Sequence, residues 1–257
     1  MTRQPAADAT LDALRLSARR LHHIASGVNE ADLTQSAYPA DWSIAQVLSH
    51  LGSAAVIMQR RLDDTLAGAR TPDDVAPEIW DLWNAKTPTQ QREDALAADA
   101  ALLARIGATT PDERARFALA MGPLTLGFTE FVGMRLNEHA LHTWDVDVAL
   151  DPAATLPPQA AELVVDNLDL VARYTAKPTG AAASITVATV DPSRGFTIDL
   201  TGDAVTFTTH EAGQAPDVEL PAEEFIRLVY GRLDPHHSPA GVGGTALDTL
   251  RAVFPGP

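Results

Sequence analysis

Apolar residues recur every three or four positions through the first 150 residues of the chain, a spacing that predicts amphipathic helices. We expect helices over residues 7–25, 43–68, 89–106 and 129–150. Ser43 and Gln46 have the spacing of a capping box, in which each side chain binds the other's backbone amide, so the second helix begins there. Asp151-Pro152 ends the fourth helix, because the residue before a proline disfavours helical backbone. Four helices of this length predict a four-helix bundle.

The remaining segments follow other patterns. Residues 71–84 contain two prolines and predict a long excursion with short helical turns. One more amphipathic helix is expected over 157–174, and β-rich runs follow at 184–190, 196–200, 205–209 and 217–220. Residues 221–230 and 245–254 predict short helices. We therefore expect two domains: a helical bundle over residues 1–152, and a small C-terminal α/β domain with an antiparallel-rich sheet over residues 153–257.

Composition narrows the classes of function. The formal net charge of −15 argues against binding to nucleic acid or to an anionic membrane, since both need a basic surface. No apolar stretch reaches the roughly 20 residues that span a bilayer, and the N-terminal residues lack a signal-peptide core, so we expect a cytoplasmic protein. The chain contains no cysteine, which excludes disulfides, thiolate metal ligands and a protein thiol nucleophile. Any thiol chemistry needs an imported thiol.

The fourth helix carries unusual residues on its inward line. Glu138 and Asp145 stand where a bundle requires apolar side chains, and His142 follows Glu138 by four residues on the same face. A buried carboxylate is costly unless it is paired or bound to a cation. His50 borders the apolar stripe of the second helix and is expected to point into the bundle. His50, Glu138 and His142 therefore predict a metal site with an open coordination position, which is typical of catalysis.

Several alternatives stand beside this prediction. Asp145 follows His142 by three residues. We expect its carboxylate to orient the His142 imidazole by binding the ring nitrogen that does not face the metal. His139 and His142 form another candidate pair, but His139 is rotated by about 100° from Glu138 and should leave its face. A metal-dependent hydrolase would use a metal-bound water, with Asp145 as the candidate general base. A non-enzymatic module that binds a metal or another ligand is a further alternative.

Three segments resemble one known family. They lie at the start of the second helix, in the fourth helix and near the C-terminus, and their residues are Trp42, Ser43 and His50, then Arg135, Glu138, His142, Trp144 and Asp145, and finally Tyr230, Gly231 and Arg232. With these residues the chain resembles the DinB-like metalloenzymes, and in particular the mycothiol-dependent maleylpyruvate isomerase family. The resemblance implies a DinB-like bundle in which His50, Glu138 and His142 hold a divalent metal, usually zinc.

The resemblance also implies an activity. The thiol of mycothiol would be the nucleophile and would add to a small-molecule electrophile. The reaction is then either cis–trans isomerisation of a maleylpyruvate-like substrate or thiol S-transfer. We expect the protein to be a monomer or a homodimer. Arg232 matches a family arginine that holds a dicarboxylate substrate. The family's second such arginine has no match here, because the corresponding region offers Arg60, Arg61 and Arg70 and then an acidic stretch. This departure leaves a neutral electrophile open.

Overall fold

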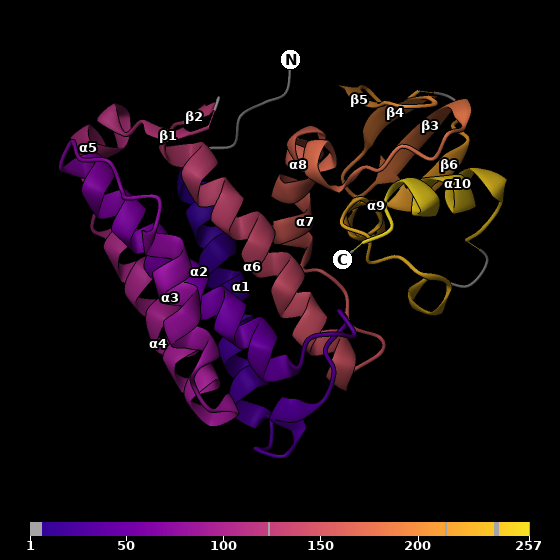
Figure 1. Cartoon of the computed structure of the whole chain (residues 1–257). Helices are drawn as coiled ribbons and strands as arrows, with labels where there is room; N and C mark the ends of the chain where they lie inside the picture. The colour runs from indigo at the N-terminus through magenta and orange to yellow at the C-terminus, as the bar shows by residue number, and fades with distance from the viewer. Residues whose placement is uncertain (1–6, 123, 214, 239–241, 257) are drawn as a thin grey trace. The chain divides into compact units, whose positions relative to one another are not determined.

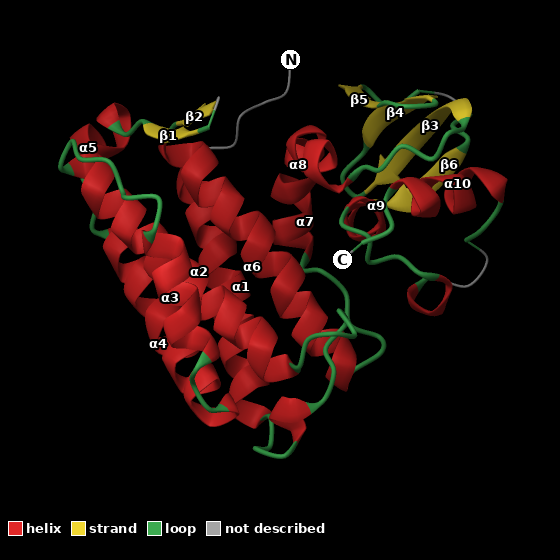
Figure 2. Ribbon diagram, viewed as in Figure 1, coloured by secondary structure: helices red, strands yellow, loops and turns green. Residues whose placement is uncertain are grey.

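The computed structural model describes residues 7–122, 124–213, 215–238 and 242–256, and it divides the chain into two compact units. The first unit ends at Ala154 and is mainly helical, whereas the second begins at Thr155 and contains a four-stranded sheet (Figure 1, Figure 2). The expectation of a helical N-terminal region followed by a small sheet domain is therefore confirmed.

Four long helices of the first unit pack side by side. They are α1 (Ala7–Gly27), α2 (Ile44–Leu66), α4 (Pro88–Gly107) and α6 (Phe128–Leu150), each within two residues of the expected bounds. Helix α1 packs along α6 and α2 packs along α4, while α2 also contacts α6 (Figure 1). Each of these four helices contributes apolar side chains to the core, and Leu14, Leu48, Leu102 and Phe131 are each completely buried.

Local hydrogen bonds fix where α2 begins. The Ser43 hydroxyl accepts the Gln46 amide at 3.2 Å, and the Gln46 side chain accepts the Ser43 amide at 2.8 Å, so the predicted capping box is confirmed. Thr87 and Gln90 cap α4 in the same way. A fixed start determines which face each later residue of the helix presents, and this places His50 two turns into α2.

Some segments of the first unit differ from expectation. The excursion at 71–84 contains a regular helix of ten residues, α3 (Val75–Asn84), and its Trp83 packs on Gly52 of α2. A side chain at Gly52 would place its Cβ 2.2 Å from the Trp83 ring. The structure also has η1 (Asp32–Thr34), α5 (Pro111–Arg116) and an unexpected antiparallel hairpin of β1 (Leu119–Met121) and β2 (Leu124–Leu126).

The second unit begins with two helices and a 3-10 turn where the sequence pattern predicts one helix. The single helix expected over 157–174 is wrong, because the chain forms α7 (Pro158–Val164), a 3-10 turn η2 (Val165–Asn167) and α8 (Leu168–Thr175). The Asn167 side chain donates to the Leu163 carbonyl at 3.3 Å. Asparagine side chains compete with the backbone for such carbonyls, which favours an interruption here.

The sheet of the second unit has the strand order β5-β4-β3-β6. Its strands are β3 (Ala182–Val190), β4 (Arg194–Thr201), β5 (Val205–His210) and β6 (Val218–Pro221). Strand β4 pairs antiparallel with β3 and β5, and β6 pairs parallel with β3. Helix α9 (Ala222–Val229) packs on the sheet through Phe225, whose ring lies 4.7 Å from that of Phe196. Segments η3 (Pro235–His237) and α10 (Thr245–Val253) follow.

No helix among the described residues is both long enough and apolar enough to cross a membrane.

Candidate metal centre

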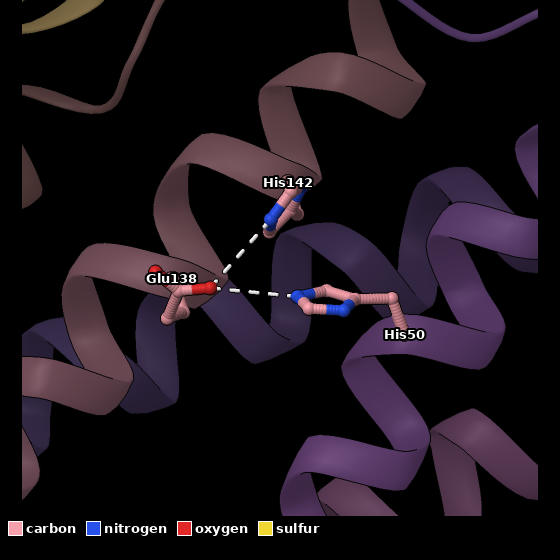
Figure 3. Close-up of side chains that lie close together, drawn as sticks. All are labelled: His50, Glu138 and His142. Carbon is pink, nitrogen blue, oxygen red and sulfur yellow. Dashed lines mark hydrogen bonds and ion pairs between the residues drawn. The ribbon is translucent and has the colours of Figure 1, made fainter. Parts of the chain in front are cut away.

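His50, Glu138 and His142 lie together between α2 and α6 (Figure 3). The Nε2 atom of His50 is 3.4 Å from the Oε2 atom of Glu138, and the Nε2 atom of His142 is 3.6 Å from the same oxygen. One ligand atom from each residue lies within 4.8 Å of the other two. The structure therefore brings together, from two helices, the three residues that the sequence pattern singled out.

The position of the group follows from the two helices. His50 lies between the buried Leu48 and Leu51 on α2, and Glu138 and His142 are one turn apart on α6. The side chains of His50, Glu138 and His142 are 31%, 42% and 14% exposed. The group thus lies at the edge of the helical core, where an ion or a small molecule can reach it.

The donor set suits a divalent metal. Two imidazole nitrogens and one carboxylate oxygen are ligands that zinc and related first-row ions accept. Ligand atoms about 2.1 Å from a tetrahedral ion lie roughly 3.4 Å from each other. The two nitrogen-to-oxygen distances in this group, 3.4 and 3.6 Å, match that spacing. Three protein ligands would leave a coordination position for a small molecule.

The electrostatics of the group favour the protonation states that a metal requires. Burial opposes the charge on Glu138, but hydrogen bonds with His142 and His50 and their charges outweigh this effect and hold its pKa well below the ordinary value. Burial lowers the pKa of His50, although the hydrogen bond to Glu138 opposes the shift. At neutral pH the carboxylate is ionised and the His50 imidazole is neutral, as metal binding needs.

Asp145 contacts the His142 ring on the side opposite Glu138. Its side chain is fully buried, and its Oδ2 atom lies 2.8 Å from the Nδ1 atom of His142. A carboxylate at this place accepts the Nδ1 proton, so the Nε2 atom of His142 would be able to bind an ion between it and Glu138. The backbone carbonyl of Asp145 also accepts the Tyr38 amide at 3.1 Å.

Trp42 is a further neighbour of this group, and in the sequence it stands out only as part of a motif. Its ring centroid lies 5.4 Å from that of His50 and 6.3 Å from that of His142, and the Trp42 and His142 planes differ by 16°. The indole lies nearly parallel to the His142 ring and tilted to the His50 ring, and Trp42 remains 37% exposed. The signal in the sequence was its position directly before the Ser43 cap.

The other residues named from the sequence lie elsewhere. His139 is completely buried and points away from the group, with its nitrogens near Ser17 and Asp99, so it forms no ligand pair with His142. Arg232 belongs to the second unit, where it follows α9, is 6% exposed and donates to the Tyr230 carbonyl at 2.8 Å. Its role stays a prediction.

Comparisons with known proteins decide the family. The model of the family described as the mycothiol maleylpyruvate isomerase N-terminal domain matches residues 14–147, more than half of the chain. The chain belongs to this family. The matched range includes all of α2 and the three ligand candidates on α2 and α6. The resemblance drawn from the sequence motifs is thereby confirmed.

Two solved structures share the fold of this family member. One is a mycothiol-dependent maleylpyruvate isomerase, with a TM-score of 0.65 and 18% identity over 93% of this chain and 97% of that chain. The other is a histidine-to-alanine mutant of a mycothiol-dependent maleylpyruvate isomerase, with the same TM-score and identity over 89% of this chain and 90% of that chain. No curated protein matches the sequence.

Proposed function

We propose that this protein is a metal-dependent enzyme that uses mycothiol as its nucleophile, with residues 1–152 as a DinB-like four-helix bundle and residues 153–257 as the α/β domain. The observation that carries the proposal is the convergence of His50, Glu138 and His142 within 4.8 Å in a chain of this family. These three residues are the proposed ligands of a divalent metal, with zinc as the proposed ion.

The chain's own residues prepare the site for a thiol. When bound, a divalent metal would lower the pKa of an incoming thiol and favour its thiolate at neutral pH. Asp145 holds the His142 ring in one orientation, and the exposed part of the Trp42 indole offers an apolar wall beside both imidazoles. Because the chain contains no cysteine, the nucleophilic sulfur has to arrive with the cosubstrate.

Cis–trans isomerisation is the reaction that the structural neighbours favour, since both are named as mycothiol-dependent maleylpyruvate isomerases. In such a reaction, the thiolate sulfur adds to one carbon of the cis double bond, and the electron pair moves into the conjugated carbonyl. Rotation about the resulting single bond and elimination of the same thiolate then give the trans product. Arg232 is the proposed partner of a substrate carboxylate.

S-transfer to a neutral electrophile is the second candidate, and a specific observation supports it. The region where the family has its second substrate arginine contains three arginines in this chain, and two of them form ion pairs with aspartates. Arg60 pairs with Asp64 at 2.7 Å, and Arg70 pairs with Asp73 at 2.8 Å. These contacts leave less positive charge for a second substrate carboxylate. In this reaction, the conjugate of the thiol and the electrophile is the product.

Turnover assays distinguish these candidates. The zinc-loaded protein is incubated with mycothiol and maleylpyruvate, and the absorbance of the substrate is followed, with His142→Ala as the inactive control. Conversion to the trans isomer supports the isomerase, whereas stable conjugates with other electrophiles support S-transfer. Hydrolysis without thiol would point to the hydrolase alternative, in which Asp145 is the general base. No reaction by metal-loaded protein would leave a binding module and would overturn the enzymatic proposal.

A further inference from the structure

A buried chain of hydrogen bonds connects α1, α2, α4 and α6. The Ser17 hydroxyl lies 2.8 Å from His139 Nδ1, and His139 Nε2 lies 3.1 Å from Asp99 Oδ2. Arg135 Nη2 donates to Asp99 Oδ1 and to the backbone carbonyl of Leu51, both at 3.0 Å. Arg135 and His139 are completely buried, and Ser17 and Asp99 are 1% and 5% exposed.

The connectivity resembles a catalytic triad, but the burial excludes that role. In a serine hydrolase the hydroxyl and the imidazole face the substrate. Here His139 has no exposed surface, and Ser17 is enclosed between helices. The residues act on one another and on the helices that carry them.

Stability alone is a weak reason for this arrangement. A buried ion pair loses the hydration of both charges, and apolar residues of similar volume often give an equally stable core. Within the described residues, the Nε and Nη1 atoms of Arg135 have no hydrogen-bond partner. The hydrogen bonds of the protein therefore offset only part of the cost of removing this guanidinium from water. Buried polar groups of this kind are best known for fixing the register of one helix against another.

The contacts of the network fall directly beside the ligand candidates. Arg135 binds the carbonyl of Leu51, the residue that follows His50 on α2. Arg135 is itself one turn before Glu138 on α6, and His139 is the residue after Glu138. Both ligand-bearing helices are therefore held by one guanidinium, at the level where their ligands meet.

We propose that Arg135 and Asp99 are positioning residues, which set the register of α2 against α6 so that His50 reaches the ion held by Glu138 and His142. This inference rests on the proposed metal site. A ligand set for a metal tolerates errors of only a few tenths of an ångström, so a small shift of α2 weakens binding while the fold persists.

The test removes both charges together. The double variant Arg135→Met, Asp99→Asn leaves no uncompensated charge, and the introduced asparagine keeps an acceptor oxygen for His139. Zinc affinity is measured in competition with a chromophoric chelator, and the Co²⁺ absorption spectrum reports the ligand geometry. We expect the Kd for zinc to rise at least tenfold and the Co²⁺ bands to change, with a thermal midpoint of the metal-free protein within a few degrees of wild type. Arg135→Lys, which keeps the charge, should give an intermediate Kd.

Leu102→Ala provides the matched control, because Leu102 is a completely buried residue of α4 outside the network. It should lower the thermal midpoint and leave the zinc Kd within twofold of wild type. Three results would overturn the positioning role while leaving the proposed function intact. These are a double variant with the wild-type zinc Kd and Co²⁺ spectrum, a double variant that fails to fold, and a loss of zinc affinity in Leu102→Ala equal to that of the double variant. If wild-type protein bound neither ion, the proposed function would fall, and the positioning role with it.

Discussion

The Oδ2 atom of Asp145 lies 2.8 Å from the Nδ1 atom of His142, and the Asp145 side chain has no exposed surface. The two residues are three apart on α6, so the helix itself aligns the carboxylate with the ring. This pair determines which nitrogen of His142 carries the proton and which one faces Glu138 and His50.

Removing the carboxylate of Asp145 should weaken metal binding without removing a ligand. For Asp145→Ala we expect a loss of about 10- to 100-fold in zinc affinity, because His142 loses the acceptor that fixes its tautomer. Asp145→Asn should lose less, since its side-chain oxygen can still accept the Nδ1 proton. Chelator competition measures both values. Equal affinities for wild type and Asp145→Ala would show that the contact does not support the site.

Substituting a ligand should release the metal. Glu138→Ala and His142→Ala each remove one of three donors, and two remaining donors hold a divalent ion weakly. Elemental analysis after dialysis should find less than a tenth of the wild-type metal content, whereas His23→Ala, an exposed histidine of α1, should retain all of it. Full retention in both ligand variants would refute the assignment of the site.

The fluorescence of Trp42 should report on ion binding. Its ring lies 5.4 Å from that of His50 and 6.3 Å from that of His142, within range of quenching by a paramagnetic ion at this site. We expect Co²⁺ to quench the emission of wild-type protein and of Trp80→Phe, a variant in α3. Trp42→Phe should lose most of this quenching. Equal quenching in both variants would place the bound Co²⁺ elsewhere.

Glu224 should make the stability of the folded chain depend on pH. Burial and the charge of Glu223 raise the pKa of its carboxyl from 4.5 to about 7, against the charge of Arg227. The folded state therefore binds this proton more tightly than the unfolded state. The stability that results is complete below about pH 4.5 and is lost as pH rises through about 7, by up to about 3 kcal/mol.

Denaturant unfolding from pH 5 to pH 8 measures this effect. Glu224→Gln should remove most of the decline with pH and be more stable than wild type at pH 8. Glu219→Gln, a variant at an exposed position of β6, should decline as wild type does. A decline in Glu224→Gln as steep as that of wild type would mean that other groups cause it.

Much of the helical unit could be predicted from local regularities. The spacing of apolar residues and the Ser43–Gln46 cap predict the bounds of α2 to within two residues, because both signals act over a single turn. The four-residue step from Glu138 to His142 places both on one face by helical geometry alone. These local rules also singled out His50, since its position beside the apolar stripe indicates the direction of its side chain.

Contacts between distant segments needed the tertiary structure. Asp99 lies in the same stripe as Ala95 and Leu102, but nothing in its own helix indicates that it pairs with Arg135 and His139. The place of Trp42 beside the two imidazoles also depends on packing between elements, since Trp42 precedes α2 and His142 lies on α6. The sequence by itself determined the four long helices of the first unit and the three ligand candidates, because those follow from interactions within a turn. Only the tertiary structure decided how the helices register against one another, because that depends on side chains far apart in the chain that fill the same buried space.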